Sequence, residues 1–323
     1  MNKLRTLTVR LLRTWTVIFA ALLQLGTSTL ADTGDFDQIV AFGDSLMDSG
    51  NAFVLTGEVA TPPFAPIPSA AYAIGGHHFS NGKTWVEVLG QALGLQRSTG
   101  PSARNPARFS NYAVGGSRAR DFDRGVSATY QVQQYLGAGA ASETALYIFG
   151  FGANDVRDVL QATDMATGQQ IIGAAVASIS NNLLALCTAG AKHIVIPNVA
   201  NIGTTPFVQT LASDLGDPSI PVSASFVSDL FNGIVQQSLT YLVQPSCSET
   251  TFYTLDLFEL STEISENYEE FGFVSNQACL TFGTTGGAIC SKPNSYFFWD
   301  GIHPTKAGHA IIAGEAINAL SSR

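Results

Sequence analysis

The chain has 323 residues, of which 46% are hydrophobic and only 13% are charged. This composition excludes an intrinsically disordered chain, because enough apolar surface is present to bury a large core. The formal net charge is −9, which argues against binding to nucleic acid or to anionic membranes through a basic patch. No linker, charge run or internal repeat divides the chain, so we expect one folded domain.

The N-terminal segment has the pattern of an export signal. Four basic residues precede a short apolar stretch from Trp15 to Leu25, and Thr29-Leu30-Ala31 then supplies small residues at both cleavage positions. The pattern predicts a signal peptide over 1–31, cleavage before Asp32 and a single domain over 32–323. An uncleaved membrane anchor is the alternative, although the stretch is short for a bilayer span.

Cleavage would change the charge and the compartment of the chain. Residues 1–31 hold four of the 16 basic residues and none of the 25 acidic ones, so the mature chain carries a net charge of −13. We expect a secreted or periplasmic protein without stable membrane insertion, and a monomer.

The four cysteines, Cys187, Cys247, Cys279 and Cys290, allow three disulfide connectivities in an exported chain. Cys279 and Cys290 flank a glycine-rich stretch that reads as a loop, which favours this pair together with Cys187–Cys247. The alternative for Cys187 is a buried free thiol on an apolar helix. No spacing resembles a zinc site.

Short apolar runs alternate along the chain with helical patterns. The runs are 38–42, 146–149, 193–196 and 251–255, and the helical patterns are 84–93, 171–189, 223–242 and 306–320. Continuous apolar runs are typical of strands buried on both faces, so the alternation predicts an α/β fold with a central parallel sheet. Functional residues are then expected just beyond the carboxyl ends of the strands.

Two segments read as long loops. The stretch 60–76 is rich in proline, alanine and glycine, and we expect it to form one wall of a cleft. The stretch 271–294 is the second expected loop.

The first strand is followed directly by Gly43-Asp44-Ser45-Leu46. Ser45 would lie at the carboxyl end of the strand, where its own backbone N–H can point at an anionic oxygen. On these four residues alone, a serine that caps a helix is the commoner explanation. A nucleophilic serine also needs a base, because its hydroxyl is protonated at neutral pH.

His303 is the candidate base among only five histidines in the chain. It follows Asp300 by three residues, just before the last helical pattern. In a turn, this spacing lets the carboxylate of Asp300 accept the Nδ1–H of His303, which leaves Nε2 free to take a proton from Ser45. The alternative is that Asp300 caps a turn and His303 lies on the surface.

Acyl transfer further requires donors for the developing oxyanion, and two junctions offer them. The block Asn111-Tyr112-Ala113-Val114-Gly115-Gly116 provides glycine N–H groups, and Gly152-Ala153-Asn154-Asp155 provides the Asn154 side-chain amide. Taken singly, the glycines are as consistent with turns and Asn154 with a helix N-cap.

In combination, these blocks resemble the GDSL (SGNH) hydrolases, in the subgroup that opens with Phe-Gly-Asp-Ser-Leu followed by Asp-Ser-Gly-Asn. Those two blocks correspond here to 42–46 and 48–51, and a Ser-Asn-Gly-x-x-Trp segment follows at 80–85. The resemblance spans residues 36 to about 320. It implies a flavodoxin-like three-layer α/β/α sandwich, with neither a metal nor an organic cofactor.

Carried over residue by residue, the resemblance implies distinct roles. Ser45 would be the nucleophile, His303 the base and Asp300 the residue that orients it. The oxyanion donors would be the Ser45 N–H, Gly116 and Asn154, with the adjacent Gly115 left open as the alternative glycine. The implied activity is hydrolysis of small-molecule or lipid carboxylic esters.

Other functions remain possible from the sequence. An acyltransferase or a phospholipase could use the same site, and a carbohydrate- or lipid-binding module could share the scaffold. The Gly-x-Ser-x-Gly elbow of α/β-hydrolases is absent around Ser45, and Gly82-Lys83-Thr84 lacks the upstream glycine spacing of a P-loop. A metal site that uses Asp300, His303 and His309 lacks a supporting motif.

The substrate itself is not specified by the sequence. An apolar acyl pocket could be lined by 60–74, Phe79, Trp85 and 297–299, although such residues more often pack in a core.

Overall fold

A computed structural model describes residues 36–57, 76–123, 125–281 and 288–322. Residues from Phe36 onward form one compact unit. The expected signal peptide, and nearly all of the expected cleft wall at 60–76, lie outside the described residues. Both therefore remain predictions.

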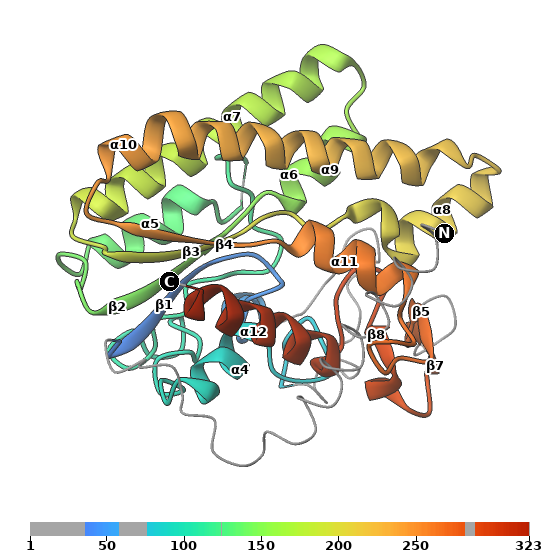
Figure 1. The fold of residues 1–323 in the computed structure, drawn as a ribbon, viewed down its shortest axis with the longest axis horizontal. Coiled ribbons are helices and arrows are strands. Elements are labelled where there is room, and N and C mark those ends of the chain that lie inside the picture. The colour runs from blue at the N-terminus through green and yellow to red at the C-terminus, as the bar shows by residue number, and fades with distance from the viewer. Residues whose placement is uncertain (1–35, 58–75, 124, 282–287, 323) are drawn as a thin grey trace, which may run out of the picture. The chain divides into compact units, whose positions relative to one another are not determined.

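Four parallel strands form the central sheet, in the order β1-β2-β3-β4 (Figure 1). They are β1 (Gln38–Gly43), β2 (Ala145–Gly150), β3 (His193–Pro197) and β4 (Thr251–Leu255). An extended segment continues the sheet beyond β1, because Ala41 N donates to Ser110 O (3.0 Å) and Tyr112 N donates to Ala41 O (2.7 Å). With this segment included, the order is that of the flavodoxin-like sheet.

The sheet is covered by helices on both faces (Figure 1). The helices are α2 (Asn51–Thr56), α4 (Trp85–Ala92), α5 (Ala128–Leu136), α6 (Ala153–Leu160), α7 (Met165–Thr188), α8 (Pro206–Leu215), α9 (Ser219–Ser238), α10 (Gln244–Ser246), α11 (Leu257–Glu266) and α12 (Lys306–Ser321). Short helical turns lie at η1 (Ile202–Thr204), η2 (Leu239–Val243) and η3 (Pro293–Ser295).

Alternation along each strand explains the three layers. In β1, Ile39 and Ala41 join the core with α4, α11 and α12, whereas Val40 and Phe42 join the core with α5, α7 and α9. Successive side chains of a strand point to opposite faces, and here both faces are apolar. The predicted α/β/α sandwich with a parallel sheet is therefore confirmed.

The segment 271–294 differs from the expected loop. It contains β5 (Ser275–Ala278), which pairs with β8 (Tyr296–Phe298), and β6 (Leu280–Thr281), which pairs with β7 (Ala288–Ile289). β6 and β7 have only two residues each and β5 is polar, so none of them gives an apolar pattern. Together with β8 they build the platform from which the Asp300–His303 turn projects.

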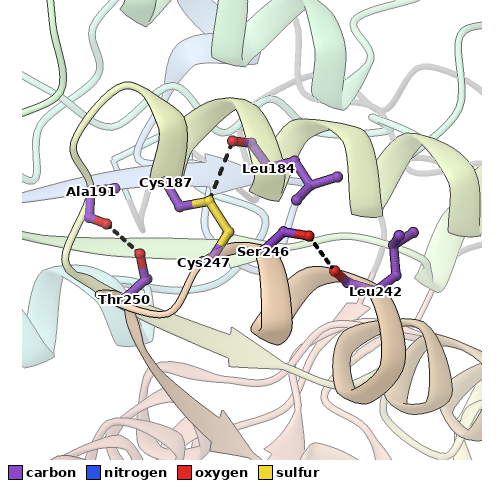
Figure 2. Close-up of a disulfide and its surroundings, with 7 residues drawn as sticks. All are labelled: Leu184, Cys187, Ala191, Leu242, Ser246, Cys247 and Thr250. Atoms are coloured by element: carbon purple, nitrogen blue, oxygen red, sulfur yellow. Dashed lines mark hydrogen bonds between the residues drawn. A yellow bond between two sulfur atoms is a disulfide. The ribbon is translucent and has the colours of Figure 1, made fainter.

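The predicted disulfide pairing matches the structure, which joins Cys187 to Cys247 and Cys279 to Cys290. Figure 2 shows the first bridge tying the end of α7 to the connection that leads into β4. Nearby, the Thr250 hydroxyl donates to Ala191 O at 2.8 Å (Figure 2). The bridge thus holds together the segments that enter β3 and β4.

Helix α7 is long and apolar enough to cross a membrane by length and composition alone. Its buried residues, which include Ile179, Leu183 and Leu186, belong to the core over the sheet. A core helix of a globular protein passes the same test.

Candidate active site

Ser45 lies in a tight turn immediately after β1. Asp44 forms this turn, since its Oδ1 accepts the Leu46 N–H (3.0 Å) and its carbonyl accepts the Met47 N–H (3.1 Å). A Cβ on Gly43 would lie 2.7 Å from the Gly150 carbonyl oxygen, so only glycine permits this close packing of β1 on β2. The turn leaves the Ser45 N–H without a hydrogen bond to any residue that the structure describes.

The imidazole of His303 links Ser45 to Asp300. The Ser45 Oγ lies 2.7 Å from His303 Nε2, and His303 Nδ1 lies 2.7 Å from Asp300 Oδ2. The two residues from the distant turn are buried, with exposed fractions of 0% for Asp300 and 3% for His303. Residues 258 positions apart are thus brought into one hydrogen-bonded chain.

Asp300 is held as a carboxylate despite its burial. Desolvation alone would raise its pKa, but His303 and the backbone N–H groups of Ile302 (2.8 Å) and His303 (2.7 Å) outweigh it and lower the pKa. An ionised Asp300 accepts the Nδ1–H and keeps Nε2 as the acceptor that faces Ser45.

The Ser-Asn-Gly segment fastens the turn that carries His303. The Ser80 hydroxyl donates to Pro304 O at 2.9 Å, and the Asn81 side-chain oxygen accepts the Lys306 N–H at 2.7 Å. The turn is closed on itself by the Trp299 N–H, which donates to His303 O at 2.7 Å. These bonds fix the position of the His303 imidazole relative to Ser45.

Two adjacent glycines differ in the availability of their N–H groups. The Gly115 N–H donates to Asp48 Oδ2 at 2.8 Å, whereas the Gly116 N–H has no hydrogen bond within the described part of the chain. Gly116 has a φ of 79°, a left-handed conformation that favours glycine, and a Cβ there would meet no atom within 4 Å. Of the two, Gly116 is the glycine with an N–H available to a ligand.

Asn154 lies in the first turn of α6, directly beyond the end of β2, and is buried with an exposed fraction of 7%. Its Nδ2 donates to Ser117 O at 2.9 Å and lies 3.5 Å from Asp44 Oδ2. One amide hydrogen is therefore fixed by the glycine block, and the other is only weakly engaged.

Asp48 and Asn51 hold the glycine block (111–116) in place through hydrogen bonds. This fully buried carboxylate accepts N–H groups from Gly50 (2.7 Å), Ala52 (3.0 Å) and Gly115 (2.8 Å). Asn51 adds two bonds of 2.8 Å from its Nδ2 to the carbonyls of Asn111 and Ala113. The Asp-Ser-Gly-Asn block (48–51) therefore supports the glycine-containing loop that follows the extended segment beside β1.

Comparison with known proteins identifies the family of this chain. The family model described as GDSL-like Lipase/Acylhydrolase matches residues 39–316. The chain belongs to the GDSL-like lipase/acylhydrolase family.

Members of this family among curated proteins match along nearly the whole chain. GDSL esterase/lipase At3g50400 of Arabidopsis thaliana is 25% identical, over 90% of this chain and 90% of its own length. Acetylajmalan esterase 2 of Rauvolfia serpentina is 24% identical, over 93% and 94%. Among solved structures, the acetylxylan esterase Axe2 of Geobacillus stearothermophilus has a TM-score of 0.46 at 15% identity, covering 88% of this chain and 94% of that one. This GDSL-family chain is a carboxylic ester hydrolase.

An apolar pocket of about 450 Å³ opens beside Ser45 and His303. Its walls come from η1, α6, α8, α9 and α11, and include Leu160, Leu211 and Ile220. Of the residues expected to line an acyl pocket, Phe297 and Phe298 do so, whereas Phe79, Trp85 and Trp299 are not among the lining residues and pack in the core. Large aromatic residues fit a buried core equally well, so the sequence could not separate the two roles.

Two residues of the site were missed by the sequence analysis. Gln131 in α5 is buried and bonds both the N–H and the carbonyl of Gly43 at 2.8 Å, as well as the Ser117 hydroxyl at 3.0 Å. Arg157 lines the pocket together with Ser45 and His303. A lone glutamine or arginine on a helix gives no local signal of such a role.

The alternative metal site considered from the sequence would use Asp300, His303 and His309. Among those that the structure describes, no group of three or more His, Cys, Asp or Glu side chains is arranged to hold a metal ion. His309 is buried, and desolvation lowers its pKa to about 3, helped by the charges of His303 and His78. Its Nδ1 faces the Trp85 N–H at 3.3 Å, so it packs between α12 and α4 as a neutral side chain.

Proposed function

We propose that this chain is an exported serine esterase that hydrolyses carboxylic esters through an acyl-enzyme on Ser45. The observation that carries the proposal is the hydrogen-bonded chain from Ser45 through His303 to Asp300, with both links at 2.7 Å. A serine whose hydroxyl faces a base that is itself oriented by a carboxylate is the arrangement that nucleophilic catalysis requires.

In the first half-reaction, Ser45 Oγ forms a bond to the ester carbonyl carbon, and its proton passes to His303 Nε2. The bond between that carbon and the alcohol oxygen then breaks, and the imidazolium gives its proton to the departing alkoxide. In the second half-reaction, His303 takes a proton from water as the water attacks the acyl-enzyme. The carboxylic acid leaves, and the proton returns to Ser45 Oγ.

Negative charge on the carbonyl oxygen would be met by three donors. The N–H groups of Ser45 and Gly116 have no hydrogen bond within the described residues, and the Asn154 amide is only weakly engaged toward Asp44. Donors held in place before the reaction stabilise this charge without reorganising during it. Asp48 and Gln131 would keep the donors in position from behind.

The apolar pocket beside Ser45 supports an acyl chain longer than acetyl as the substrate group. Apolar side chains from several helices surround the space next to the nucleophile, and burying each methylene of an acyl chain contributes about 0.8 kcal/mol. A panel of esters from acetyl to long acyl, with a phospholipid and an acetylated sugar, measures this preference. An added alcohol in the same assay separates hydrolysis from acyl transfer.

Export is supported by the basic and apolar pattern of the first 31 residues and by the two disulfides, which persist in oxidising compartments. The N-terminal residue of protein purified from the culture medium or periplasm tests it. Asp32 is the expected first residue, and recovery of residues 1–31 on the purified protein would refute cleavage.

The catalytic assignment is tested with p-nitrophenyl hexanoate. We expect Ser45→Ala and His303→Ala to abolish hydrolysis while the circular dichroism spectrum is preserved. Ser49→Ala is the matched control, because the Ser49 hydroxyl is buried in the same loop with no hydrogen-bond partner in the described part of the chain. Full activity in Ser45→Ala would refute the proposal.

Asn154→Ala tests the oxyanion donors separately. We expect kcat to fall about 10²–10³-fold, the usual cost of removing one such donor. A loss of less than about threefold would remove Asn154 from this role.

A further inference from the structure

Arg157 lies on α6, and Arg118 and Arg120 lie beside this helix. The three arginines differ in their partners. Arg118 donates to Asp158 at 2.8 Å, and Arg120 donates to Asp155 and Asp158 at 2.6 Å. The guanidinium of Arg157 forms no hydrogen bond or ion pair with any residue that the structure describes. The two carboxylates beside it on α6 are already taken by the other two arginines.

Arg157 faces the reaction centre. It follows Asn154 by three residues on α6, and this spacing places both side chains on one face of the helix. Both residues line the pocket that contains Ser45 and His303. The backbones of the two residues are therefore less than one helical turn apart, or ~4.5 Å along the axis.

A partly buried guanidinium without a partner costs stability. Burial lowers the pKa of Arg157 and the nearby charge of Arg118 lowers it further, and the attractions of Asp158 and Asp44 do not offset them. The guanidinium nevertheless stays charged at neutral pH, and its planar fork of donors matches carboxylate and phosphate oxygens. A charge of this kind at a ligand pocket is explained when the ligand brings the opposite charge.

Two further carboxylates, Asp44 and Asp217, lie near Arg157 on other segments. Asp44 lies behind Ser45, where its Oδ1 is engaged by the Leu46 N–H, and only long-range attraction connects it to Arg157. Asp217 lies at the rim of the pocket, is exposed, and accepts from the Ser219 N–H at 2.9 Å and its hydroxyl at 2.6 Å. Neither carboxylate pairs with the guanidinium.

We propose that Arg157 binds an anionic oxygen group, either a carboxylate or a phosphate, carried by the ester substrate. The site then recognises an amphiphilic ester, whose acyl chain packs on Leu160, Leu211 and Ile220 while its anionic group pairs with Arg157. This inference rests on the proposed esterase function of Ser45.

Matched ester pairs test the inference and distinguish the two sources of charge. For a carboxylate on the acyl side, mono-p-nitrophenyl adipate is compared with neutral p-nitrophenyl hexanoate. For a phosphate on the alcohol side, dihexanoyl phosphatidic acid is compared with dihexanoylglycerol. The readout is the ratio of kcat/KM for the anionic ester to that for its neutral counterpart.

Arg157→Gln should lower this ratio at least about tenfold for one of the two pairs, mainly through KM, as expected for loss of a charge-assisted hydrogen bond. Arg157→Lys should restore part of the ratio by keeping the charge. Arg97→Gln is the matched control, because it removes the same charge from an exposed side chain outside the pocket. It should leave both ratios at the wild-type value.

An unchanged ratio for both pairs in Arg157→Gln would overturn the inference. Equal losses on anionic and neutral esters would also overturn it, because they would mean that Arg157 acts through Asp44 and the turn. Failure of the underlying function is separable: if Ser45→Ala hydrolyses the esters as well as the wild type, the esterase proposal itself fails. In that case, calorimetric titration of Ser45→Ala with adipate and hexyl phosphate, with and without Arg157→Gln, still decides whether Arg157 binds the anion.

Discussion

Replacing Asp300 by asparagine tests the proposed catalytic chain with little disturbance of the fold. The asparagine Oδ1 can still accept the N–H groups of Ile302 and His303, which Asp300 Oδ1 now accepts at 2.8 and 2.7 Å. In place of Asp300 Oδ2, however, the variant presents an amide that donates a hydrogen bond toward His303 Nδ1. The imidazole must then carry its proton on Nε2, where it faces Ser45 as a donor and cannot act as the base.

The expected loss is large, because both the tautomer and the charge are affected. A wrong tautomer in a Ser-His-Asp triad lowers kcat by about 10³–10⁴-fold, which corresponds to roughly 4–5.5 kcal/mol of the activation barrier. The assay is kcat for p-nitrophenyl hexanoate at pH 8, with the near-ultraviolet circular dichroism spectrum as a check on the fold.

Asp256→Asn is the matched control for this substitution. Asp256 caps α11, and its Oδ1 accepts the Glu259 N–H at 3.1 Å and the Asn198 side chain at 2.8 Å. Asparagine keeps both bonds, so kcat should stay at the wild-type value. A loss below about tenfold in Asp300→Asn, with the fold intact, would refute the claim that Asp300 orients the base.

Three further predictions follow from buried groups. Asp48→Asn removes the oxygen that accepts the N–H groups of Gly115 and Ala52, so the free energy of unfolding measured in urea should fall by about 3–6 kcal/mol. The kcat should also fall as the neighbouring Gly116 moves. Wild-type stability and activity would contradict this prediction. Burial chiefly raises the pKa of Asp44 from 3.8 to about 6, so the stability that the protonated carboxyl contributes is present below pH 3.8 and is lost as the pH rises through 6. The free energy of unfolding of Asp44→Asn should therefore rise relative to that of the wild type by about 3 kcal/mol between pH 3 and pH 8. No change in this difference with pH would refute the prediction. The Cys187–Cys247 bridge closes 60 residues, so replacing both cysteines by serine should lower the free energy of unfolding by about 4 kcal/mol, against about 3 for the 11-residue Cys279–Cys290 bridge; equal unfolding midpoints with and without the bridges would contradict both values.

The sequence identified the strands better than the helices. All four strands of the central sheet were predicted to within one residue at each end, because each is a continuous apolar run closed by glycine, proline or aspartate, whereas β5–β8 were not predicted. Helix α6 was missed because its sequence, with two aspartates and an arginine in eight residues, has no apolar stripe of sufficient length. Helix α9 begins at Ser219, four residues before the predicted start, since Pro221 is tolerated in the first turn.

The start of helix α7 was also predicted too late in the chain. It begins at Met165, six residues before the expected Ile171. The Asp164 side chain accepts the Thr167 N–H at 2.8 Å and caps this end. A capping aspartate was visible in the sequence, but the run from Thr167 to Gln170 carries no apolar pattern that would indicate the helix.

The candidate site residues were predicted from their positions at element junctions and from the family resemblance. Ser45 follows β1, Asn154 follows β2, and the Asp300–His303 turn follows β8. The proximity of Ser45 and Asn154 could be inferred from the topology of the central parallel sheet, whose carboxyl ends meet at one edge. The position of the Asp300–His303 turn could not be inferred in this way, because β8 belongs to a separate two-stranded sheet. The contacts that hold them could not be inferred, because Gln131 and Asp48 act across long separations through hydrogen bonds that leave no local pattern.

The choice between Gly115 and Gly116 illustrates what only three-dimensional structure decides. Both residues are glycines in the same block, and both carry an N–H that a substrate could approach. The buried carboxylate of Asp48, 67 residues earlier, takes the N–H of Gly115 and thereby fixes the peptide that presents the N–H of Gly116. If this is how the oxyanion donor is positioned, Asp48→Asn should lower kcat without raising KM, because the donor acts on charge that exists only in the transition state. An increase in KM with unchanged kcat would instead mean that the loop shapes the substrate pocket.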